Sequence, residues 1–357
     1  MWDVAVIGAG LAGLTCARQL RAAGNQVCIL DKSRGLGGRM ATRRVTGLVR
    51  VDHGLRYWQP TSVALDDLTQ ELLQAKVLRP WPVTAYELRQ RDELVTVEPG
   101  TTPGMVYAAP EGMSAIAKYL ARDFTPEDTL LKEHRATSLT PYEGGWRIGC
   151  EGNKVVMAQR CAIAIPAPQL ADLLSTCPPG SLQSEALSIL KSVDYHPCIT
   201  VLAGYGQQKD MGELDPNGWM VTDTIGTSTD WIGLDSSKRA PSSSETASAE
   251  TTVVIHSKPD FARRYLDSGD LQPAASVLLR ASARKYGDWL AQPEWFQIHR
   301  WHYAQVKTGY SETALILSEQ PQVTLVSGGD WCSHQQQTLA GIDAAYLSGN
   351  AMAEALK

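Results

Sequence analysis

The chain has 357 residues, a formal net charge of −5 and 43% hydrophobic residues. This length allows two domains with sizeable cores. Because charges of both signs are interspersed along the chain, the sequence lacks the basic stretches that mark a protein that binds nucleic acid. No run of about 18 apolar residues occurs, so we expect no membrane span.

The cysteines and the first residues bear on the compartment. The seven cysteines include no CxxC pair, and most of them lie in apolar runs. We therefore expect reduced core residues, with neither a disulfide framework nor a metal site. The first predicted strand follows the start so closely that Met1-Trp2-Asp3 leaves no room for a cleaved signal. These features favour a cytoplasmic protein.

The most informative segment is 4–13, which reads VAVIGAGLAG. It predicts a buried strand that runs into a glycine-rich turn and then a helix over 11–23, the start of a Rossmann-type dinucleotide-binding fold. Gly8 permits the tight turn, Gly10 lets the backbone approach a pyrophosphate, and Gly13 lets the helix pack closely on the strand. The helix directs its N-terminus, with about half a positive charge, at the phosphates.

A second predicted strand, 26–30, ends in Asp31. An acid at this distance from the glycines is expected to bind a ribose hydroxyl. The alternative is a glycine-rich turn that binds no nucleotide. Because strand, turn, helix, second strand and acid follow in order within the first 31 residues, we favour the nucleotide site.

The stretch directly after the acid, 33–42, reads SRGLGGRMAT. Its Gly37 and Gly38 let the chain pass beside a dinucleotide, and Arg34 and Arg39 supply cations for a diphosphate. This stretch resembles the second glycine motif of the flavoproteins that include amine oxidases, polyene desaturases and protoporphyrinogen oxidases. The resemblance implies that the dinucleotide is FAD rather than NAD.

Two further segments fit a flavin site. The segment 52–58, DHGLRYW, resembles the part of these flavoproteins that runs past the flavin ring. Near the end of the chain, 323–326 predicts a buried strand, and Asp330 follows at its carboxyl end, where α/β folds bind ligands. We expect Asp330 to accept a hydrogen bond from a ribityl hydroxyl. The last helix is expected to begin at Leu339, with its free N–H groups facing the pyrimidine end of the flavin.

The predicted fold class is α/β, with the chain leaving the nucleotide domain and returning to it twice. The Rossmann-type, glutathione-reductase-like FAD-binding domain comprises 1–80, 105–170 and 310–357, as in the amine-oxidase superfamily. The remaining residues, 81–104 and 171–309, form a discontinuous α+β substrate domain on a mixed sheet. Within it, the polar stretch 236–245 is interpreted as a mobile hairpin excursion.

Several blocks together resemble the renalase family over nearly the whole chain. The glycine motifs are common to all amine-oxidase-like flavoproteins, whereas 231–239 (WIGLDSSKR) and 301–306 (WHYAQV) are more specific. The resemblance implies non-covalent FAD and oxidation of the 2- and 6-dihydro isomers of NAD(P)H. It also implies O2 as the electron acceptor and H2O2 as the product.

Two residues depart from the pattern of that family. Arg56 stands where the family has a glutamine-like residue, and it adds a cation near the flavin or the substrate. Asp343 lies one turn into the last helix, where it either weakens an anion-stabilising pocket or faces water. Both departures bear on the substrate more than on the cofactor.

The implied chemistry needs no general base, because loss of hydride from a dihydropyridine creates an aromatic pyridinium. The protein has to place the donor carbon about 3–3.5 Å from flavin N5 and exclude water. Aromatic side chains suit this task, with core packing as the alternative for each. The aromatic candidates are Tyr57, Trp58, Trp219, Tyr303 and Trp331. His302 and His334 rank low as groups that orient a carboxamide or phosphate, and Lys307 is expected to be solvated.

The predicted site residues follow from these motifs and from the resemblance. Those that bind the cofactor are Gly8, Gly10, Leu11, Ala12, Gly13, Asp31, Lys32, Arg34, Gly38, Arg39, Met40, His53, Gly54, Leu55, Ala136, Gly329, Asp330, Gly341 and Ile342. Those that act on the substrate are Arg56, Tyr57, Tyr303 and Trp331. The expected partners are O2 and a small molecule, either a dihydronicotinamide nucleotide or an amine, and we favour a monomer.

Other functions stay open at this point. An amine oxidase and a polyene desaturase are the alternatives among flavoproteins, and a mean hydropathy of −0.19 disfavours the membrane-docking surface of a desaturase. A flavin-binding protein with a structural or regulatory role is the alternative of another class. Since only one dinucleotide motif is visible, a nicotinamide has to enter the substrate pocket itself.

Overall fold

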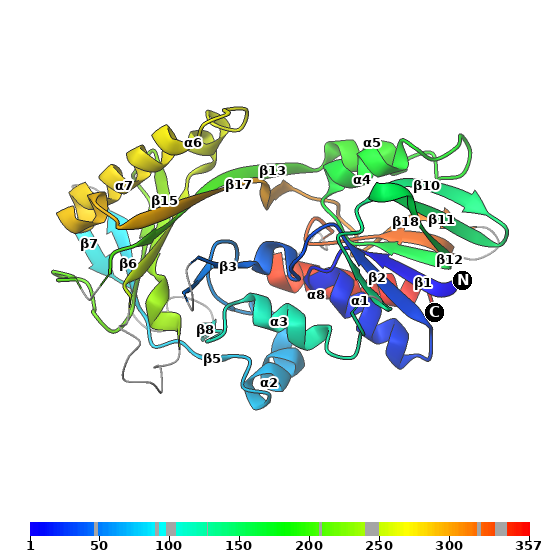
Figure 1. The fold of residues 1–357 in the computed structure, drawn as a ribbon, viewed down its shortest axis with the longest axis horizontal. Helices are drawn as coiled ribbons and strands as arrows, with labels where there is room; N and C mark the ends of the chain where they lie inside the picture. The colour runs from blue at the N-terminus through cyan, green and yellow to red at the C-terminus, as the bar shows by residue number, and fades with distance from the viewer. Residues whose placement is uncertain are drawn as a thin grey trace.

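The computed structural model describes residues 1–45, 49–89, 93–97, 105–126, 128–206, 209–239, 250–319, 323–332 and 341–357. Two lobes, each built on one sheet, lie side by side (Figure 1). Within these residues, no helix is both long and apolar enough to cross a membrane. The same residues hold no group of three or more metal-ligating side chains.

The first lobe contains an eight-stranded sheet. Its strands are β1 (Trp2–Ile7), β2 (Val27–Asp31), β9 (Leu130–Lys132), β10 (Ala136–Tyr142), β11 (Gly145–Cys150), β12 (Lys154–Ile163), β18 (Leu315–Glu319) and β19 (Val323–Ser327). They follow the order β10-β11-β12-β1-β2-β9, with β19 beside β12 and β18 beside β19. β1 pairs in parallel with both β2 and β12, so the predicted Rossmann start lies at the centre of the sheet.

Helices cover both faces of this sheet. They are α1 (Leu11–Ala22), α2 (Asp66–Gln74), α3 (Ser114–Leu120), α4 (Ala167–Leu174), α5 (Ala186–Ser192) and α8 (Gly341–Ala355). Val4 and Val6 of β1 pack with α1, α3 and α8, whereas Ala5 and Ile7 pack with α4 and α5. This alternation is the two-residue period of a strand, and burial on both faces explains why β1 is apolar throughout.

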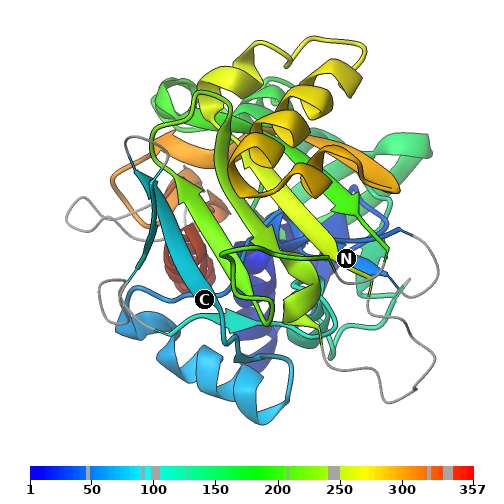
Figure 2. The same ribbon diagram turned by 90° about the vertical axis from the view of Figure 1, so that its left-hand side faces the viewer.

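The second lobe contains a mixed seven-stranded sheet. Its strands are β6 (Thr84–Arg89), β7 (Glu93–Thr96), β13 (Asp194–Gly204), β14 (Trp219–Asp223), β15 (Thr229–Leu234), β16 (Thr252–Ser257) and β17 (Trp295–Thr308). They follow the order β17-β13-β16-β15-β14-β6-β7, and β14 pairs in parallel with β6. Helices α6 (Pro259–Arg263) and α7 (Gln272–Tyr286) pack on one face, at the top of Figure 2.

Short elements complete the fold. Two ribbons pair β3 (Thr42–Arg44) with β4 (Arg50–Asp52) and β5 (Arg79–Pro80) with β8 (Tyr107–Ala108). The 3-10 helices are η1 (Gly38–Met40), η2 (Val63–Leu65), η4 (Glu151–Asn153), η5 (Asp235–Lys238) and η6 (Asp288–Ala291).

Two long paired strands connect the lobes. β13 and β17 run antiparallel from the pair Gly204 and Trp295 to the pair Asp194 and Thr308, and they reach from one lobe to the other (Figure 1). Tyr195 at one end of β13 packs in the core of the first lobe, while the middle and the other end of the strand pack in the core of the second. Side chains on these strands are therefore placed between the lobes.

The predicted domain boundary at residue 170 disagrees with the packing of α4 and α5. β6 and β7 join the second sheet, to which 81–104 was assigned. The boundary at residue 170, however, falls inside α4, and both α4 and α5 pack in the core of the first lobe. The reason is that Leu170, Leu173 and Leu174 form a buried apolar side of α4.

The interpretation of 236–245 as a mobile excursion is wrong for its first part. Residues 235–238 form η5, and both Asp235 and Lys238 are fully buried. Lys238 Nζ lies 2.8 Å from Asp235 Oδ1, and Arg239 lies 2.5 Å from Asp235 and 3.0 Å from Asp52. Burial is possible because each charge meets an opposite one. Residues 240–249 lie outside the described residues.

Candidate functional site

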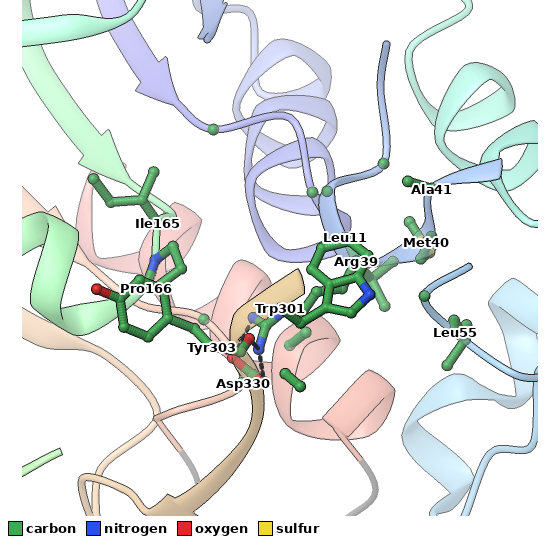
Figure 3. Close-up of a pocket in the computed structure, with 18 of the residues that line it drawn as sticks. Leu11, Arg39, Met40, Ala41, Leu55, Ile165, Pro166, Trp301, Tyr303 and Asp330 are labelled. Carbon is green, nitrogen blue, oxygen red and sulfur yellow. Dashed lines mark hydrogen bonds and ion pairs between the residues drawn. The ribbon is translucent and has the colours of Figure 1, made fainter. Parts of the chain in front are cut away.

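A cavity of about 2070 Å³ lies between the lobes. It is lined by the glycine turns of the first lobe, the β3–β4 ribbon, the loop 53–59 and the facing side of β15, β16 and β17. Every predicted cofactor residue except Gly13 lines this cavity, and so do all four residues predicted on the substrate side. Figure 3 shows residues of both lobes converging on it, including Leu11, Arg39, Trp301 and Asp330.

The glycines of the first turn have two different roles, close packing of the helix and approach of a ligand. A Cβ atom at Gly13 would lie 1.9 Å from the carbonyl oxygen of Gly8, so Gly13 serves the contact between helix and turn and does not face the cavity. Gly8 has a φ of +108°, which favours glycine. A Cβ atom at Gly10 would meet no protein atom within 4 Å. Gly10 therefore opens into the cavity.

The start of α1 has the features of a phosphate site. Gly10 is the N-cap residue, and no side chain caps the first N–H groups of the helix. Leu11 and Ala12, which carry these groups, line the cavity. Uncapped N–H groups and the helix dipole together favour an anion, so a diphosphate fits here.

Asp31 holds the turn in place. Its carboxylate accepts hydrogen bonds from the backbone N–H of Ala9 and of Ser33, both at 2.7 Å. The side chain lines the cavity, and a carboxylate has about four acceptor sites. It therefore retains acceptor capacity for a ribose hydroxyl.

Arg39 and Asp330 form an ion pair across the cavity wall. The guanidinium donates through Nη1 and Nη2 to the two carboxylate oxygens, each at 2.6 Å (Figure 3). Burial opposes the charge of Arg39, but Asp330 more than offsets this and holds the pKa of Arg39 above its ordinary value. The two residues were predicted to contact a diphosphate and a ribityl chain separately. Their pairing instead ties the second glycine motif to the end of β19.

Lys32 and Arg34 lie at the outer edge of the cavity. Lys32 donates to Gln169 at 3.2 Å, and Arg34 pairs with Glu133 at 3.0 Å with 91% of its side chain exposed. Ala136, on the edge strand β10, also lines the cavity. These positions lie on the side of the cavity where Asp31 is expected to bind a ribose hydroxyl.

Arg56 is held rigidly on the opposite wall. Its Nε donates to His256 Nδ1 at 3.0 Å, its Nη2 lies 2.5 Å from Asp230, and its guanidinium lies over the ring of Trp231. The predicted cation is present in the cavity, but Asp230 compensates its charge. Burial and then Arg56 hold the pKa of His256 well below its ordinary value, so this imidazole is neutral.

Three rings pack together where Gly54 approaches Arg39. The ring of Trp301 lies 5.4 Å from that of His53 and 4.2 Å from that of His299. Burial, His299 and Arg43 lower the pKa of His53 to about 3, and burial and Arg43 lower the pKa of His299 to about 4. Both imidazoles are therefore neutral, and the cavity gains an apolar, aromatic wall.

Sequence reasoning missed the roles of His299 and Trp301. These residues and Tyr303 stand at alternate positions of β17, and all residues from 299 to 303 line the cavity. The two-residue period of a strand places such residues on one face. The available signal was the aromatic ring at every second position of the segment 299–303, HRWHY.

Three of the five aromatic candidates, Trp58, Trp219 and Trp331, have fully buried side chains that pack in the cores. Trp58 is fully buried and donates to Thr69 Oγ1 at 3.0 Å, and Trp219 is fully buried in the core of the second lobe. Tyr57, Tyr303 and Trp331 line the cavity. Trp331 donates to the carbonyl oxygen of Ile165 at 3.2 Å, which fixes its ring.

Asp343 does neither of the things expected of it. It is fully buried and accepts four hydrogen bonds, from the backbone N–H and the hydroxyl of both Thr61 and Ser62. The carboxylate thus anchors the start of η2. Lys307 is half-exposed and pairs with Asp194 at 2.8 Å, as suits a solvated lysine. His334 and the predicted helix start at Leu339 lie outside the described residues.

Two family models match this chain. The model of NAD(P)-binding Rossmann-like domains matches residues 6–72, and that of flavin containing amine oxidoreductases matches residues 98–357. A Mycobacterium tuberculosis protein, named for flavin-containing monoamine oxidase and called AofH, is 43% identical over 70 residues. That match covers 20% of this chain, which spans only about 15% of the relative's length.

Solved structures share the whole fold. A putrescine oxidase bound to putrescine superposes with a TM-score of 0.72 at 14% identity, covering 99% of this chain and 98% of that one. A cyclohexylamine oxidase from Brevibacterium oxydans gives 0.70 at 13% identity, covering 99% of both chains. The predicted fold class is confirmed. Since the second family model spans most of the chain, the protein belongs to the family of flavin containing amine oxidoreductases.

Proposed function

We propose that the protein is an oxidase that takes a hydride from a dihydronicotinamide nucleotide, the 2- or 6-dihydro isomer of NAD(P)H. Bound FAD supplies the chemistry by accepting the hydride at N5 and passing two electrons to O2, which with two protons gives H2O2. The donor leaves as an aromatic pyridinium, so no residue has to remove a proton from it.

The charge of the cavity wall carries this proposal. On the β3–β4 ribbon, the loop 53–59 and strands β15 to β17, the cavity is lined by five cations but, among described residues, by one acid, Asp230. The cations are Arg43, Arg44, Arg56, Arg300 and Lys307. Lys307 is paired with Asp194, and Arg300 donates to the carbonyl oxygens of Leu266 and Ser268, so within the described ranges Arg43 and Arg44 carry the uncompensated charge of this wall. Asp230 is already paired with Arg56. This wall favours an anionic nucleotide, because its one carboxylate is compensated. Asp172 of α4 lines the cavity from the first lobe, near Tyr303.

The remaining residues suit an uncharged, flat ring beside the flavin. Neutral His53 and His299 with Trp301 form an aromatic surface that packs on a ring and excludes water. Arg56 has Nε and Nη2 engaged, while Nη1 has no partner among the described residues. Because the guanidinium is fixed before a ligand arrives, Nη1 is placed to donate to a carboxamide or phosphate oxygen.

Amine oxidation is the second candidate. It is favoured by the names of the related proteins, a monoamine oxidase, a putrescine oxidase and a cyclohexylamine oxidase. The two functions make opposite demands on the charge of the substrate, and this difference can be measured.

Arg56→Gln and Asp230→Asn are expected to change the KM for the dihydronicotinamide in opposite directions. Removing the cation leaves Asp230 uncompensated, so the KM for a 2- or 6-dihydronicotinamide dinucleotide rises about tenfold, a change of about 1.4 kcal/mol. Removing the acid frees the charge of Arg56, and the KM falls. Peroxide formation by the FAD-loaded variants, with dihydronicotinamides and primary amines as donors, checks this. The proposal would be contradicted if the wild type oxidised amines but no dihydronicotinamide, and if Arg56→Gln improved the oxidation of amines.

A further inference from the structure

Three cations meet where the β3–β4 ribbon lies against α3. Arg44 and Arg50 face each other directly in the ladder between the two strands. Thr42, two residues before Arg44 and so on the same face, accepts a hydrogen bond from the backbone N–H of Ser114 at 3.0 Å. Lys118 lies one helical turn beyond Ser114 on the same side of α3. The ribbon and the helix thus bring the three charges together.

These charges are poorly compensated. Arg50 pairs with Glu111 at 2.9 Å, and Glu111 is 68% exposed. Within the described part of the chain, neither Arg44 nor Lys118 forms an ion pair. Like charges directly opposite each other in a ladder destabilise it. Burial and the nearby Arg44 and Arg50 also lower the pKa of Lys118. The cluster therefore keeps a surplus of two positive charges in the apo protein.

Arg44 and Lys118 both line the cavity that holds the predicted FAD site. At about 2070 Å³ this cavity is larger than the roughly 300–1,000 Å³ of a pocket for one drug-sized ligand. The start of α1 at Gly10 already offers a place for the diphosphate of FAD. A second anionic group therefore has both space and charge at the ribbon.

We propose that Arg44 and Lys118, with the charge of Arg50 close by, bind the diphosphate of the dihydronicotinamide dinucleotide and so set the preference for a dinucleotide over smaller donors. A diphosphate carries about two negative charges, which matches the surplus of the cluster. The proposal rests on the proposed function for the identity of the ligand. The subsite binds the end of the substrate remote from the reacting ring, so its effect falls on binding and not on hydride transfer.

Kinetics with two donors test this subsite. Lys118→Gln and Arg44→Gln are each expected to raise the KM for dihydro-NAD about tenfold, as the loss of one charge-assisted hydrogen bond does, with kcat unchanged. The KM for the corresponding dihydronicotinamide riboside, which lacks phosphate, stays the same. Arg147→Gln is the matched control, because Arg147 is exposed on β11 and does not line the cavity. Equal effects on both donors, or none on either, would overturn the proposal.

Binding of ADP to the oxidised, FAD-loaded protein separates this subsite from the proposed reaction. If no dihydronicotinamide is oxidised but ADP binds and Lys118→Gln weakens it about tenfold, the subsite stands and the proposed function falls. If the donors are oxidised but ADP does not bind, the subsite is wrong. Two other results would also overturn the proposal. If inorganic pyrophosphate binds and ADP does not, the cluster is an adventitious anion site. If Lys118→Gln loses FAD, the cluster belongs to the cofactor site.

Discussion

Gly10→Ala is expected to fold normally and to lose FAD. A Cβ atom at this position meets no protein atom within 4 Å, so the fold tolerates it, but it occupies the space through which a diphosphate approaches the start of α1. The dissociation constant for FAD should rise at least about tenfold, or about 1.4 kcal/mol. Flavin absorbance of the purified variant and its thermal unfolding without added FAD measure the two effects separately.

Gly13→Ala should have the opposite effects: it destabilises the fold and leaves the approach of the diphosphate open. Its Cβ would lie 1.9 Å from the carbonyl oxygen of Gly8, so α1 has to move away from the turn at a cost of about 3 kcal/mol in the free energy of unfolding. Gly269→Ala is the control, because Gly269 is exposed in the second lobe and a Cβ there meets nothing. Equal FAD binding by Gly10→Ala and Gly269→Ala would contradict the assigned diphosphate position.

Asp52→Asn is expected to destabilise the protein by about 3–5 kcal/mol. Asp52 is buried with Lys238 and Arg239, and the asparagine leaves one buried cation uncompensated. Its side-chain oxygen still accepts hydrogen bonds from Thr42 and Met113, so the loss reports the charge and not these bonds. Urea unfolding of the FAD-loaded protein measures the effect.

The double variant Asp52→Asn with Lys238→Met serves as the control. It restores the balance of one cation and one acid, Arg239 and Asp235, and should recover part of the lost stability. A double variant no more stable than Asp52→Asn would show that charge balance is not what holds η5 against β4.

Asp52 also predicts a dependence of stability on pH. Burial raises the pKa of its carboxyl, but Arg239 and Lys238 outweigh burial and hold the pKa below its ordinary value of 3.8. The folded state therefore binds this proton less tightly than the unfolded state. The stabilisation is complete above about pH 4 and is lost as the pH falls through the folded pKa, and the asparagine variant should lack this part of the acid transition.

The local parts of the site were predictable from sequence, because consecutive residues build them. The turn at Gly8 and Gly10, the start of α1 and the acid Asp31 lie within one strand–turn–helix–strand unit whose geometry fixes their spacing. The position of Asp330 at the site was predictable because ligands bind at the carboxyl ends of parallel strands. These residues all line the cavity.

Partnerships between distant residues were not predictable. Arg39 and Asp330 are 291 positions apart, and Arg56 and His256 are 200 apart, so only the packed lobes bring them together. Trp58 resembled a cavity residue because it follows the flavin motif, yet it turns into the core and donates to Thr69. A single sequence gives the residue types at such positions, but the direction of each side chain depends on the tertiary packing.

Anaerobic mixing of the FAD-loaded protein with each donor tests the proposed function most directly. Absorbance of the oxidised flavin should be lost with 2- or 6-dihydronicotinamide dinucleotides and persist with primary amines and diamines. Admission of O2 should restore the absorbance with one H2O2 formed per pyridinium. Loss of absorbance with amines, and its persistence with every dihydronicotinamide isomer, would contradict the account and make the protein an amine oxidase.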